Sequence, residues 1–391
     1  MPKILMIVQS NYLSDPRVRR EAEALADAGY RIDVVALRGD GEQFKQSVNG
    51  VTFYGIALGR EHGSVIRYLY EYGVFLVCAA VLAAALHVKN RYDLVQIHNL
   101  PDTLVFAAMF PKLAGARLVF DAHEAMPESF RMKFGWTEMS RGFRFAELLE
   151  RFCMALSDHI LTIHEPMRQL FISRRGVRPE RISVVMNWPD DRLFRHATEE
   201  LLVLNGKFDL IYAGTIAERY GLQTAIRALP LLVGEIPGLH LRILGKGDYT
   251  AALRQLAREL DVEAYVSFQP PVPLVEVPEV YQSSSVGISP QGDSVFGSIY
   301  FSTKVAEYLA VGLAAVVART PIMDRFYNDS QVAFFAPGDY HGFAGCVLRL
   351  YREPAYRQSL IENGLMLSKR CNWETEKRAY LSVVAQLASR H

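Results

Sequence analysis

The chain has 391 residues, which at ~100–200 residues per domain predicts two or three domains. Half of the residues are hydrophobic and 22% are charged, so there is apolar material for two cores, and the net charge of +1 argues against nucleic acid as a partner. The four cysteines lack CxxC spacing, which argues against a disulfide framework or a zinc site and fits a reducing compartment.

The first half of the chain predicts strands that alternate with helices. Residues 3–8 form an apolar strand without the pattern of a signal peptide, and residues 17–28 form a helix that ends at Gly29. Further strands are predicted at residues 31–36, 51–55, 94–98, 117–121, 159–163 and 182–186. Short apolar strands separated by helices are typical of a doubly wound parallel sheet.

Residues 73–88 carry no formal charge over sixteen positions. A helix that spans a membrane needs about 20 predominantly apolar residues, so this segment is short, and its many alanines weaken it further. We therefore predict a buried helix that covers the sheet and not a transmembrane anchor.

The same pattern starts again after a polar stretch at residues 187–207, which we interpret as an interdomain linker. Strands are predicted at residues 209–214, 240–245, 265–268, 286–289 and 314–318, with helices at residues 222–232, 249–260, 278–283 and 304–310. The tail is predicted to be helical over residues 356–389, with a break at Asn372. Such paired halves bind ligands at the carboxyl ends of their strands, in a cleft.

The stretch of residues 301–317 carries the most informative chemistry. Lys304 and Glu307 stand three residues apart at the start of a predicted helix and therefore share one face. Ser302 or Thr303 can cap this helix, where free backbone N–H groups favour an anion. A phosphate would fit at Lys304 while Glu307 accepts hydrogen bonds from sugar hydroxyls. A capped surface helix with an ion pair explains the same spacing.

A series of motifs runs through nearly the whole chain: NYLSDPRVRREAEALADAGY, IHNLPDTLVFAA, FDAHEAMPESF, NWPDDRLF, YAGTIAERYGLQTAIRAL, LGKGD and the helix that begins near Lys304. In order and spacing they resemble the GT-B glycosyltransferases of family 4, which are retaining and use nucleotide sugars, and among these the bacterial enzymes of exopolysaccharide or cell-surface glycan assembly. The resemblance implies two Rossmann-like parallel-sheet domains that face each other across a cleft. We assign residues 1–190 to acceptor binding, residues 191–370 to donor binding, and residues 371–391 to a helix that packs back towards the first domain.

His123 is the leading catalytic candidate of the first half. It stands in DAHE just beyond a predicted strand, and the family's matching histidine touches the donor sugar near the reacting carbon. Glu124 and Glu128 flank it and could hold the imidazole or accept a proton from the acceptor.

Three more candidates of the first half, His98, Asn99 and Arg17, lie at strand ends or beside them. His98 and Asn99 end a strand that faces the cleft in the resembling enzymes, although a structural histidine bonded to a backbone carbonyl fits equally well. Asp102 is placed to cap the helix that follows. Arg17 is nearest the first loop, so we favour it for a phosphate or a sugar acid, with a solvated basic face as the alternative.

The second half departs from the family pattern at several positions. The family's arginine and lysine slots in the turn GTIAERYG hold Thr215 and Tyr220, so the neighbouring Arg219 is assigned to the diphosphate. The earlier glutamate of the family pair is replaced by Ile299, so backbone N–H groups near residues 296–298 are expected to contact the sugar. Glycines after a strand let the backbone approach a nucleotide, or simply form a turn. The predicted donor contacts are Gly214, Thr215, Gly245, Lys246, Gly297, Ser298, Thr303 and Glu307.

The expected mechanism follows from the charge that develops on the leaving diphosphate. The sequence contains no Asp-x-Asp motif, so we expect Lys304, Arg219 and helix N-termini to stabilise this charge without a metal, with His123 as the third catalytic residue. The only small molecule required would be the UDP- or GDP-linked donor. The predicted function is retaining transfer of a sugar to a glycan or lipid-linked acceptor, and a nucleotide-sugar epimerase on the same fold is the alternative.

Residues 130–145 mix basic and aromatic side chains. They are Arg131, Lys133, Arg141 and Arg144 with Phe130, Phe134, Trp136, Phe143 and Phe145. Such a segment suits a membrane interface with anionic lipids, and it predicts a cytoplasmic enzyme at the inner face of the cytoplasmic membrane. A loop and helix packed on the core is the alternative.

Overall fold

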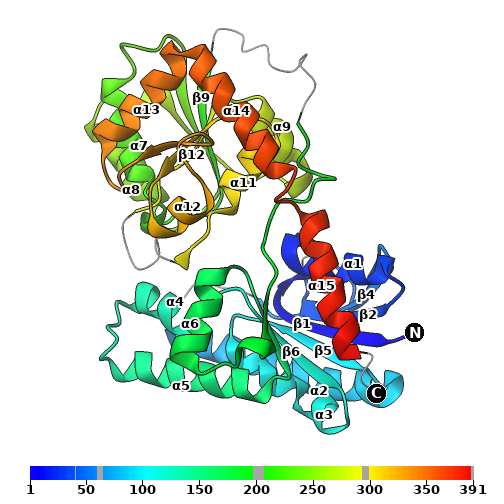
Figure 1. The fold of residues 1–391 in the computed structure, drawn as a ribbon. Helices are drawn as coiled ribbons and strands as arrows, with labels where there is room; N and C mark the ends of the chain where they lie inside the picture. The colour runs from blue at the N-terminus through cyan, green and yellow to red at the C-terminus, as the bar shows by residue number, and fades with distance from the viewer. Residues whose placement is uncertain (40, 60–64, 197–206, 293–298, 389–391) are drawn as a thin grey trace. The chain divides into compact units, whose positions relative to one another are not determined.

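The computed structural model describes residues 1–39, 41–59, 65–196, 207–292 and 299–388. The chain divides into two compact units, one of Met1–Asn187 with Glu376–His391 and one of Trp188–Thr375. Each unit is built on one predominantly or wholly parallel sheet with helices packed against it (Figure 1). The predicted fold class, two parallel-sheet α/β domains, is therefore confirmed.

The first unit has an eight-stranded sheet in the order β3-β4-β2-β1-β5-β6-β7-β8. The strands are β1 (Lys3–Asn11), β2 (Arg31–Leu37), β3 (Lys45–Val48), β4 (Val51–Ile56), β5 (Leu94–His98), β6 (Arg117–Ala122), β7 (His159–Thr162) and β8 (Ile182–Val184). All neighbours are parallel except β3, which runs antiparallel to β4 at the edge and was not predicted. Residues Ile4, Leu5, Met6 and Ile7 of β1 are fully buried, as expected of a central strand covered on both faces.

Helices cover both faces of this sheet. They are α1 (Pro16–Asp27), α2 (Val65–Asn90), the 3-10 helix η2 (Asp102–Ala108), α3 (Met109–Leu113), α4 (Met126–Phe134), α5 (Arg141–Leu156) and α6 (Glu165–Arg175). Helix α1 begins where the Asp15 side chain accepts a hydrogen bond from the Val18 backbone N–H, with Pro16 in the first turn. The following Gly29 has φ +88°, the left-handed conformation expected at a helix end.

Helix α2 differs from its prediction in length and in burial. It runs for 26 residues, and only its inner side, with Phe75, Ala79 and Ala83, is buried in the core. Its segment Tyr70–Asn90 is long and apolar enough to cross a membrane, but one such helix is weak evidence, and a third of its most apolar window is buried in the structure. The prediction of a buried helix is therefore wrong for its outer side.

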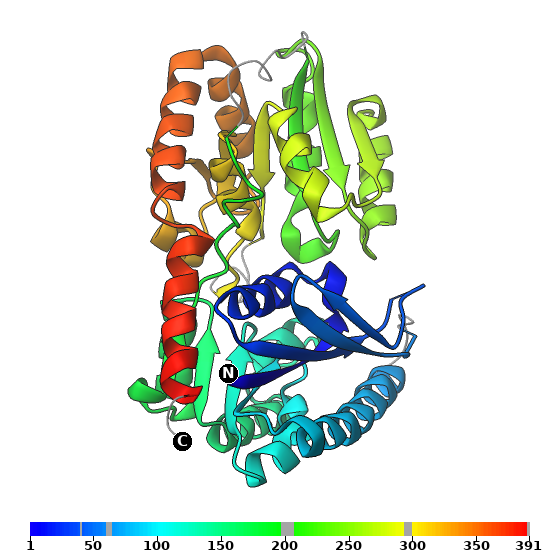
Figure 2. The same cartoon turned by 90° about the vertical axis from the view of Figure 1, so that its right-hand side faces the viewer.

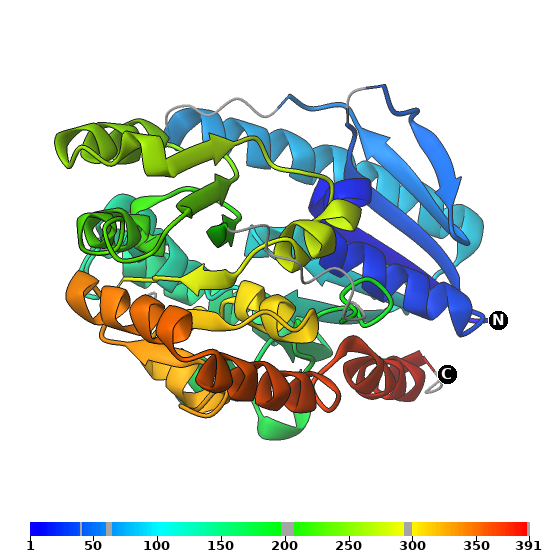
Figure 3. The same ribbon diagram turned by 90° about the horizontal axis from the view of Figure 1, so that it is seen from above.

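The second unit has a six-stranded, wholly parallel sheet in the order β11-β10-β9-β12-β13-β14. The strands are β9 (Phe208–Ala213), β10 (Leu239–Leu244), β11 (Val266–Gln269), β12 (Val286–Ser289), β13 (Ala315–Ala318) and β14 (Ala333–Phe335). The helices are η5 (Glu218–Tyr220), α7 (Leu222–Ala228), α8 (Thr250–Glu259), α9 (Val277–Gln282), α11 (Thr303–Ala310), α12 (Pro321–Phe326), α13 (Tyr340–Arg352) and α14 (Pro354–Ser368). Helix α14 packs beside α11 (Figure 3).

The end of the chain forms the predicted pair of helices, α14 and α15 (Trp373–Ala388), with the break at residues 369–372. From Glu376 onward α15 belongs to the first unit, and Figure 2 shows it in red. The hydroxyl of Tyr380 donates a hydrogen bond of 2.7 Å to the buried amide oxygen of Gln96 on β5. The last helix therefore completes the core of the unit in which the chain begins.

Candidate functional site

The second unit has a cavity of about 290 Å³ at the carboxyl ends of β9 and β10. Its lining residues are Ala213, Gly214, Thr215, Tyr220, Leu244, Pro271, Val272, Leu274, Val277, Tyr281, Tyr300, Thr303, Lys304 and Glu307. The strand ends supply one wall, and α9 and the first turns of α11 supply others. This is the position at which parallel α/β sheets bind ligands.

Lys304 is the buried cation of this cavity, with 9% of its surface exposed. Its Nζ lies 5.0 Å from the ring centre of Tyr212 and 5.3 Å from that of Tyr220, so two aromatic faces contact the ammonium group. A Cβ at Gly214 would stand 3.0 Å from the lysine Cε. The glycine, with φ +147°, therefore lets the lysine approach the end of β9.

Burial lowers the pKa of Lys304, and the nearby charge of Glu307 only partly offsets this. Within the described part of the chain, no carboxylate lies within ion-pair distance of the Lys304 ammonium group. The Oε2 atom of Glu307 accepts a hydrogen bond of 3.1 Å from the hydroxyl of Tyr281. The predicted pair thus lies on one face of α11 and lines the same cavity, but it is not the ion pair of an ordinary surface helix.

Tyr308 fixes helix α11 to the neighbouring strands β9 and β12. The Tyr308 hydroxyl donates towards the carbonyl oxygens of Ile211 and Ile288, at 3.2 and 3.3 Å, and a Cβ at Gly287 would collide with its ring. Ser302 is the N-cap residue, but its side chain makes no capping bond, which corrects the prediction of a side-chain cap. The Val305 N–H donates to the Ser302 carbonyl oxygen at 3.2 Å, so the N–H groups of Thr303 and Lys304 are the ones that could bind an anionic ligand.

Other predicted donor contacts lie outside the cavity lining. Arg219 is exposed with its guanidinium 4.9 Å from the Tyr220 ring centre, and the structure brings Tyr220 and not Arg219 into the cavity. Lys246 is exposed as well. A Cβ at Gly245 would lie 1.8 Å from the carbonyl oxygen of Gly214, so this glycine is required by the packing of two loops. Gly297 and Ser298 lie outside the described residues.

Three tyrosines of this region were not identified as site residues from the sequence. Tyr212 comes from β9, Tyr281 from α9 and Tyr300 from the segment before α11. The ring of Tyr300 lies 5.6 Å from that of Tyr220. No local motif marks these residues, because they meet only when the sheet is formed.

In the first unit, the predicted residues gather around the buried carboxylate of Asp121 at the end of β6. Arg17 donates two hydrogen bonds to it, of 3.1 and 2.5 Å, and also lies 3.3 Å from Glu21. Nδ1 of His98 lies 2.8 Å from the same carboxylate. Arg17 is 7% exposed and His98 is fully buried, which corrects the predictions of a phosphate contact and a cleft-lining histidine.

This cluster is a buried ion-pair network. Burial alone would raise the pKa of Asp121, but the charge of Arg17, the nearby His123 and the hydrogen bond from His98 hold it well below its usual range. Burial would lower the pKa of His98, but Asp121 and Glu21 raise it above its usual value. Ligand atoms of Glu21, His98 and Asp121 lie within 4.8 Å of one another, the spacing of a metal site. The Arg17 cation already contacts both carboxylates.

Asn99 positions the loop that carries His123. Its side-chain oxygen accepts hydrogen bonds from the backbone N–H groups of His123 and Glu124, at 3.1 and 3.3 Å, and its amide donates to the Glu124 carbonyl at 2.6 Å. The imidazole Nδ1 of His123 lies 3.8 Å from the Asp121 carboxylate, and the side chain is 27% exposed. Arg17, His98 and Asn99 are buried, whereas His123 is partly exposed and also has an acidic neighbour. Glu124 is exposed and accepts a hydrogen bond from Ser129.

Glu128 has a structural partner instead of the predicted imidazole. Both of its carboxylate oxygens accept hydrogen bonds of 2.8 Å from the buried guanidinium of Arg175. Asp102 does not cap the following helix either, because its side chain accepts from the Asn99 amide at 3.0 Å.

A separate cavity of about 480 Å³ lies at the ends of β1 and β2. Its lining is Ser10, Asn11, Ser14, Asp15, Pro16, Leu37, Arg38, Gly39, Leu58 and Gly59.

Residues 130–145 do not form one amphipathic segment. They are divided between α4, a loop and the start of α5. Phe130 packs edge-on against Trp136 at 6.0 Å, Phe143 is buried, and Arg131 pairs with Glu138 at 3.2 Å. Three of the aromatic side chains that were predicted to contact a membrane, Phe130, Trp136 and Phe143, therefore pack within the protein. The alternative of a loop and helix packed on the core describes this segment better.

Two family models match the chain and together cover most of it. Residues 14–188 match the glycosyl transferase 4-like domain, and residues 196–365 match the glycosyl transferases group 1 family. The D-inositol 3-phosphate glycosyltransferase of Thermobifida fusca is 25% identical over 379 residues, which cover 90% of this chain and 84% of that protein. The putative colanic acid biosynthesis glycosyl transferase WcaI of Escherichia coli is 26% identical over half of each chain.

Solved structures show the same fold over the full length of the chain. Sucrose-phosphate synthase from Thermosynechococcus elongatus has a TM-score of 0.81 at 16% identity, with all of both chains covered. Anabaena HepE, solved in complex with UDP-glucose, has a TM-score of 0.72 at 15% identity and covers 99% of this chain and all of its own. With both halves matched by glycosyltransferase models, the chain belongs to the family 4 glycosyltransferases of the GT-B fold.

Proposed function

We propose that the enzyme binds a nucleotide-sugar donor in the second-unit cavity and transfers the sugar, with retention of anomeric configuration, to a glycan or lipid-linked acceptor. The observation that carries the donor assignment is the buried ammonium group of Lys304, which has no carboxylate partner among the described residues and shares its cavity with Glu307. A buried charge without a counter-ion is unfavourable, and a diphosphate would supply one. The complex of HepE with UDP-glucose supports a nucleotide-sugar donor, which we expect to be UDP- or GDP-linked.

Each residue of the cavity then has a chemical task. Lys304 stabilises the negative charge that develops on the leaving diphosphate, together with the first-turn N–H groups of α11. Glu307, held by the Tyr281 hydroxyl, accepts hydrogen bonds from the ribose. Within the first unit we assign His123 to the reacting sugar, because it is partly exposed and its Nδ1 faces Asp121. The mechanism so described requires no metal.

We assign the acceptor to the first unit, where the cavity lined by Ser10, Asn11 and Ser14 offers hydroxyl and amide groups to a sugar. The likeness to WcaI supports bacterial exopolysaccharide or cell-surface glycan assembly as the process. Such an enzyme would work in the cytoplasm, where its donor is made, and at the inner face of the membrane when the acceptor is lipid-linked.

Calorimetric titration with UDP and GDP tests the donor site. We expect Lys304→Met and Glu307→Gln each to weaken nucleotide binding by roughly 10- to 150-fold, because charge-assisted contacts contribute about 1.5–3 kcal/mol. Lys207→Met is the matched control, since Lys207 is exposed just before β9, at the opposite end of that strand. Unchanged affinity in the Lys304 variant would remove the nucleotide from this cavity.

A further inference from the structure

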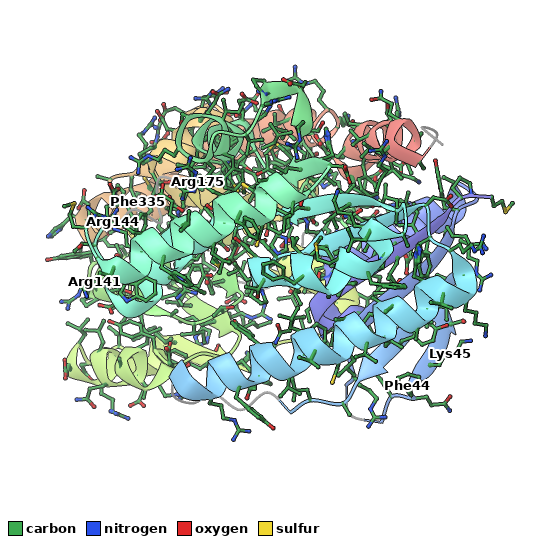
Figure 4. The ribbon with its side chains drawn as sticks, turned by 90° about the horizontal axis from the view of Figure 1, so that it is seen from below. Phe44, Lys45, Arg141, Arg144, Arg175 and Phe335 are labelled. Atoms are coloured by element: carbon green, nitrogen blue, oxygen red, sulfur yellow. The ribbon has the colours of Figure 1, made fainter. Side chains whose placement is uncertain are left out.

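Four helices, α2, η2, α3 and α5, form a continuous layer on one face of the first unit's sheet. Helix α2 packs against η2 and α3, and η2 packs against α5. The ring of His87 on α2 meets Phe110 on α3 at 6.2 Å, and Phe106 on η2 meets Phe152 on α5 at the same distance. Figure 4 shows α2 and α5 together on the side of the unit that is seen from below.

The outer side of α2 is apolar over most of its length. Val77, Val81 and Val88 are 63%, 67% and 69% exposed and stand four and seven residues apart, so they form one stripe along the helix. Between Arg67 and Lys89 none of the described exposed residues of α2 is charged. A helix at a water-exposed surface normally places polar side chains on this side.

The outer side of α5 mixes apolar and basic residues. Phe145, Leu148 and Phe152 are 67%, 65% and 52% exposed. The exposed charged side chains of this helix are the arginines Arg141, Arg144 and Arg151, of which Arg141 and Arg144 are labelled in Figure 4. The acidic residues point elsewhere: Glu150 is buried, and Glu147 accepts a hydrogen bond of 2.7 Å from Arg175.

Together these helices carry more than half of the large hydrophobic side chains that the structure shows as exposed, nine of seventeen. We call them the apolar face: Tyr70, Val77, Val81 and Val88 of α2, Phe110 and Leu113 of α3, and Phe145, Leu148 and Phe152 of α5. Contiguous exposed apolar surface on such a scale marks a site of interaction.

We propose that the apolar face docks on the surface of a membrane that contains anionic lipid. The arginines of α5 complement anionic headgroups, and the exposed valine and aromatic side chains match the headgroup–acyl boundary. Helix α2 packs on the sheet through Phe75, Ala79 and Ala83, so it lies along the membrane surface and does not cross it. This surface differs from residues 130–145 as a whole and is independent of the donor cavity.

Vesicle sedimentation of the full chain tests the proposal. Binding is expected to vesicles of phosphatidylglycerol and phosphatidylcholine, to be much weaker with phosphatidylcholine alone, and to fall with salt, because the screening length shrinks from roughly 10 Å at 0.1 M to about 3 Å at 1 M. The triple variant Arg141→Gln, Arg144→Gln, Arg151→Gln should bind roughly a hundredfold more weakly, at about 1 kcal/mol per arginine. Removal of three exposed arginines of the second unit, Arg227→Gln, Arg258→Gln and Arg370→Gln, should leave vesicle binding unchanged.

Variants of the apolar part separate insertion from simple charge attraction. The pairs Val77→Ser with Val81→Ser and Phe145→Ser with Leu148→Ser should each lose most vesicle binding, whereas Met366→Ser, an exposed position of α14, should not. A fluorophore on the exposed thiol of Cys78 should shift to the blue on binding, since α2 would enter the interface. Because these changes lie outside the donor cavity, UDP affinity should be unaffected in all of them.

Two results would overturn the proposal. In the first, wild-type protein stays in solution with anionic vesicles at low salt. In the second, light scattering shows a dimer that the Val77 and Val81 changes dissociate while vesicle binding persists, which would make the apolar face an interface between two copies. Loss of UDP binding in the wild type would instead contradict the donor assignment and leave the docking surface untouched.

Discussion

At the scale of single residues, Asp121 organises the first unit's candidate site. Its buried carboxylate contacts Arg17, His98 and, at 3.8 Å, His123. Removing one partner of a buried ion pair leaves the other charge uncompensated, which is more costly than losing a surface pair. Asp121 therefore acts first on stability, and through His123 on the position of a catalytic candidate.

Asp121→Asn should destabilise the first unit by about 3–5 kcal/mol, because Arg17 and His98 both lose the buried carboxylate that they contact and Arg17 keeps only Glu21. The control is Asp158→Asn, whose pair with Lys112 is about a quarter exposed and should contribute only about 1 kcal/mol. Urea unfolding followed by circular dichroism measures both. Equal losses in the two variants would show that the Asp121 network is no stronger than a surface pair.

His98 gives the network a pH dependence of known sign. Its pKa is raised in the folded chain, so its contribution is complete below its unfolded pKa of about 6.5 and is lost as pH rises through the raised value. Asp121, with its lowered pKa, acts in the other direction only below about pH 4. Urea midpoints of the wild type should therefore fall more steeply than those of His98→Asn as the pH rises above about 6.5. Parallel curves would contradict this account.

Contacts between residues close in sequence could be predicted, and contacts between residues far apart in sequence could not. Lys304 and Glu307 are three residues apart on one helix, so their shared face was predictable from spacing. Arg17 and Asp121 are 104 residues apart in sequence. They meet only because β5 lies between β1 and β6 in the sheet and pairs with both strands. Spacing within a helix cannot show that contact. The same holds for Tyr212, which contacts Lys304 from β9, and for Tyr281, which lines the cavity from α9.

At the scale of elements, buried strands were easy to predict and edge elements were not. β5 and β12 were predicted at their observed bounds, because both are short apolar runs that end in polar residues. β3 was missed since an edge strand with the pattern exposed, half-buried, exposed, half-buried has little apolar signal. Helix α2 was predicted as buried because sequence alone does not tell an apolar side that packs on a sheet from one that is exposed at the surface of the unit.

The loop after β10 offers a prediction at this scale. Gly245 has φ +152°, and a Cβ there would stand 1.8 Å from the Gly214 carbonyl oxygen. Gly245→Ala should therefore cost about 1–3 kcal/mol of stability and weaken UDP binding, because Gly214 lines the donor cavity. Gly234→Ala, where a Cβ meets no atom within 4 Å, is the control. Wild-type thermal stability and UDP affinity in the Gly245 variant would show that this loop packing is dispensable.

At the scale of the whole molecule, the chain joins two α/β units, and the last helix returns to the first of them. The composition predicted two cores, and the order of motifs predicted the family. Of the three cations that the sequence assigned to the donor, Lys304 lines the cavity, whereas Arg219 and Lys246 lie outside its lining. Which side chains line the cavity depends on such local placements and therefore required the structure.

The proposed mechanism makes metal dependence a property of the whole enzyme that can be measured. Since Lys304 and the N-terminus of α11 are assigned to the diphosphate, donor turnover should change less than twofold after dialysis against EDTA. Added Mg²⁺ or Mn²⁺ should not raise it. An activity that disappears with EDTA and returns with a divalent ion would assign the diphosphate charge to a metal.

The central claim is that the donor nucleotide binds in the second-unit cavity at Lys304, and photoaffinity labelling tests it most directly. The full chain is irradiated with an azido derivative of UDP-glucose, and in parallel of a GDP-sugar, and the labelled peptides are identified by mass spectrometry. The account predicts label on peptides that contain residues 271–281 or 300–307, abolished by excess unmodified donor and strongly reduced in Lys304→Met. Label that is competed by donor yet lies in residues 1–187, or that persists undiminished in Lys304→Met, would contradict it.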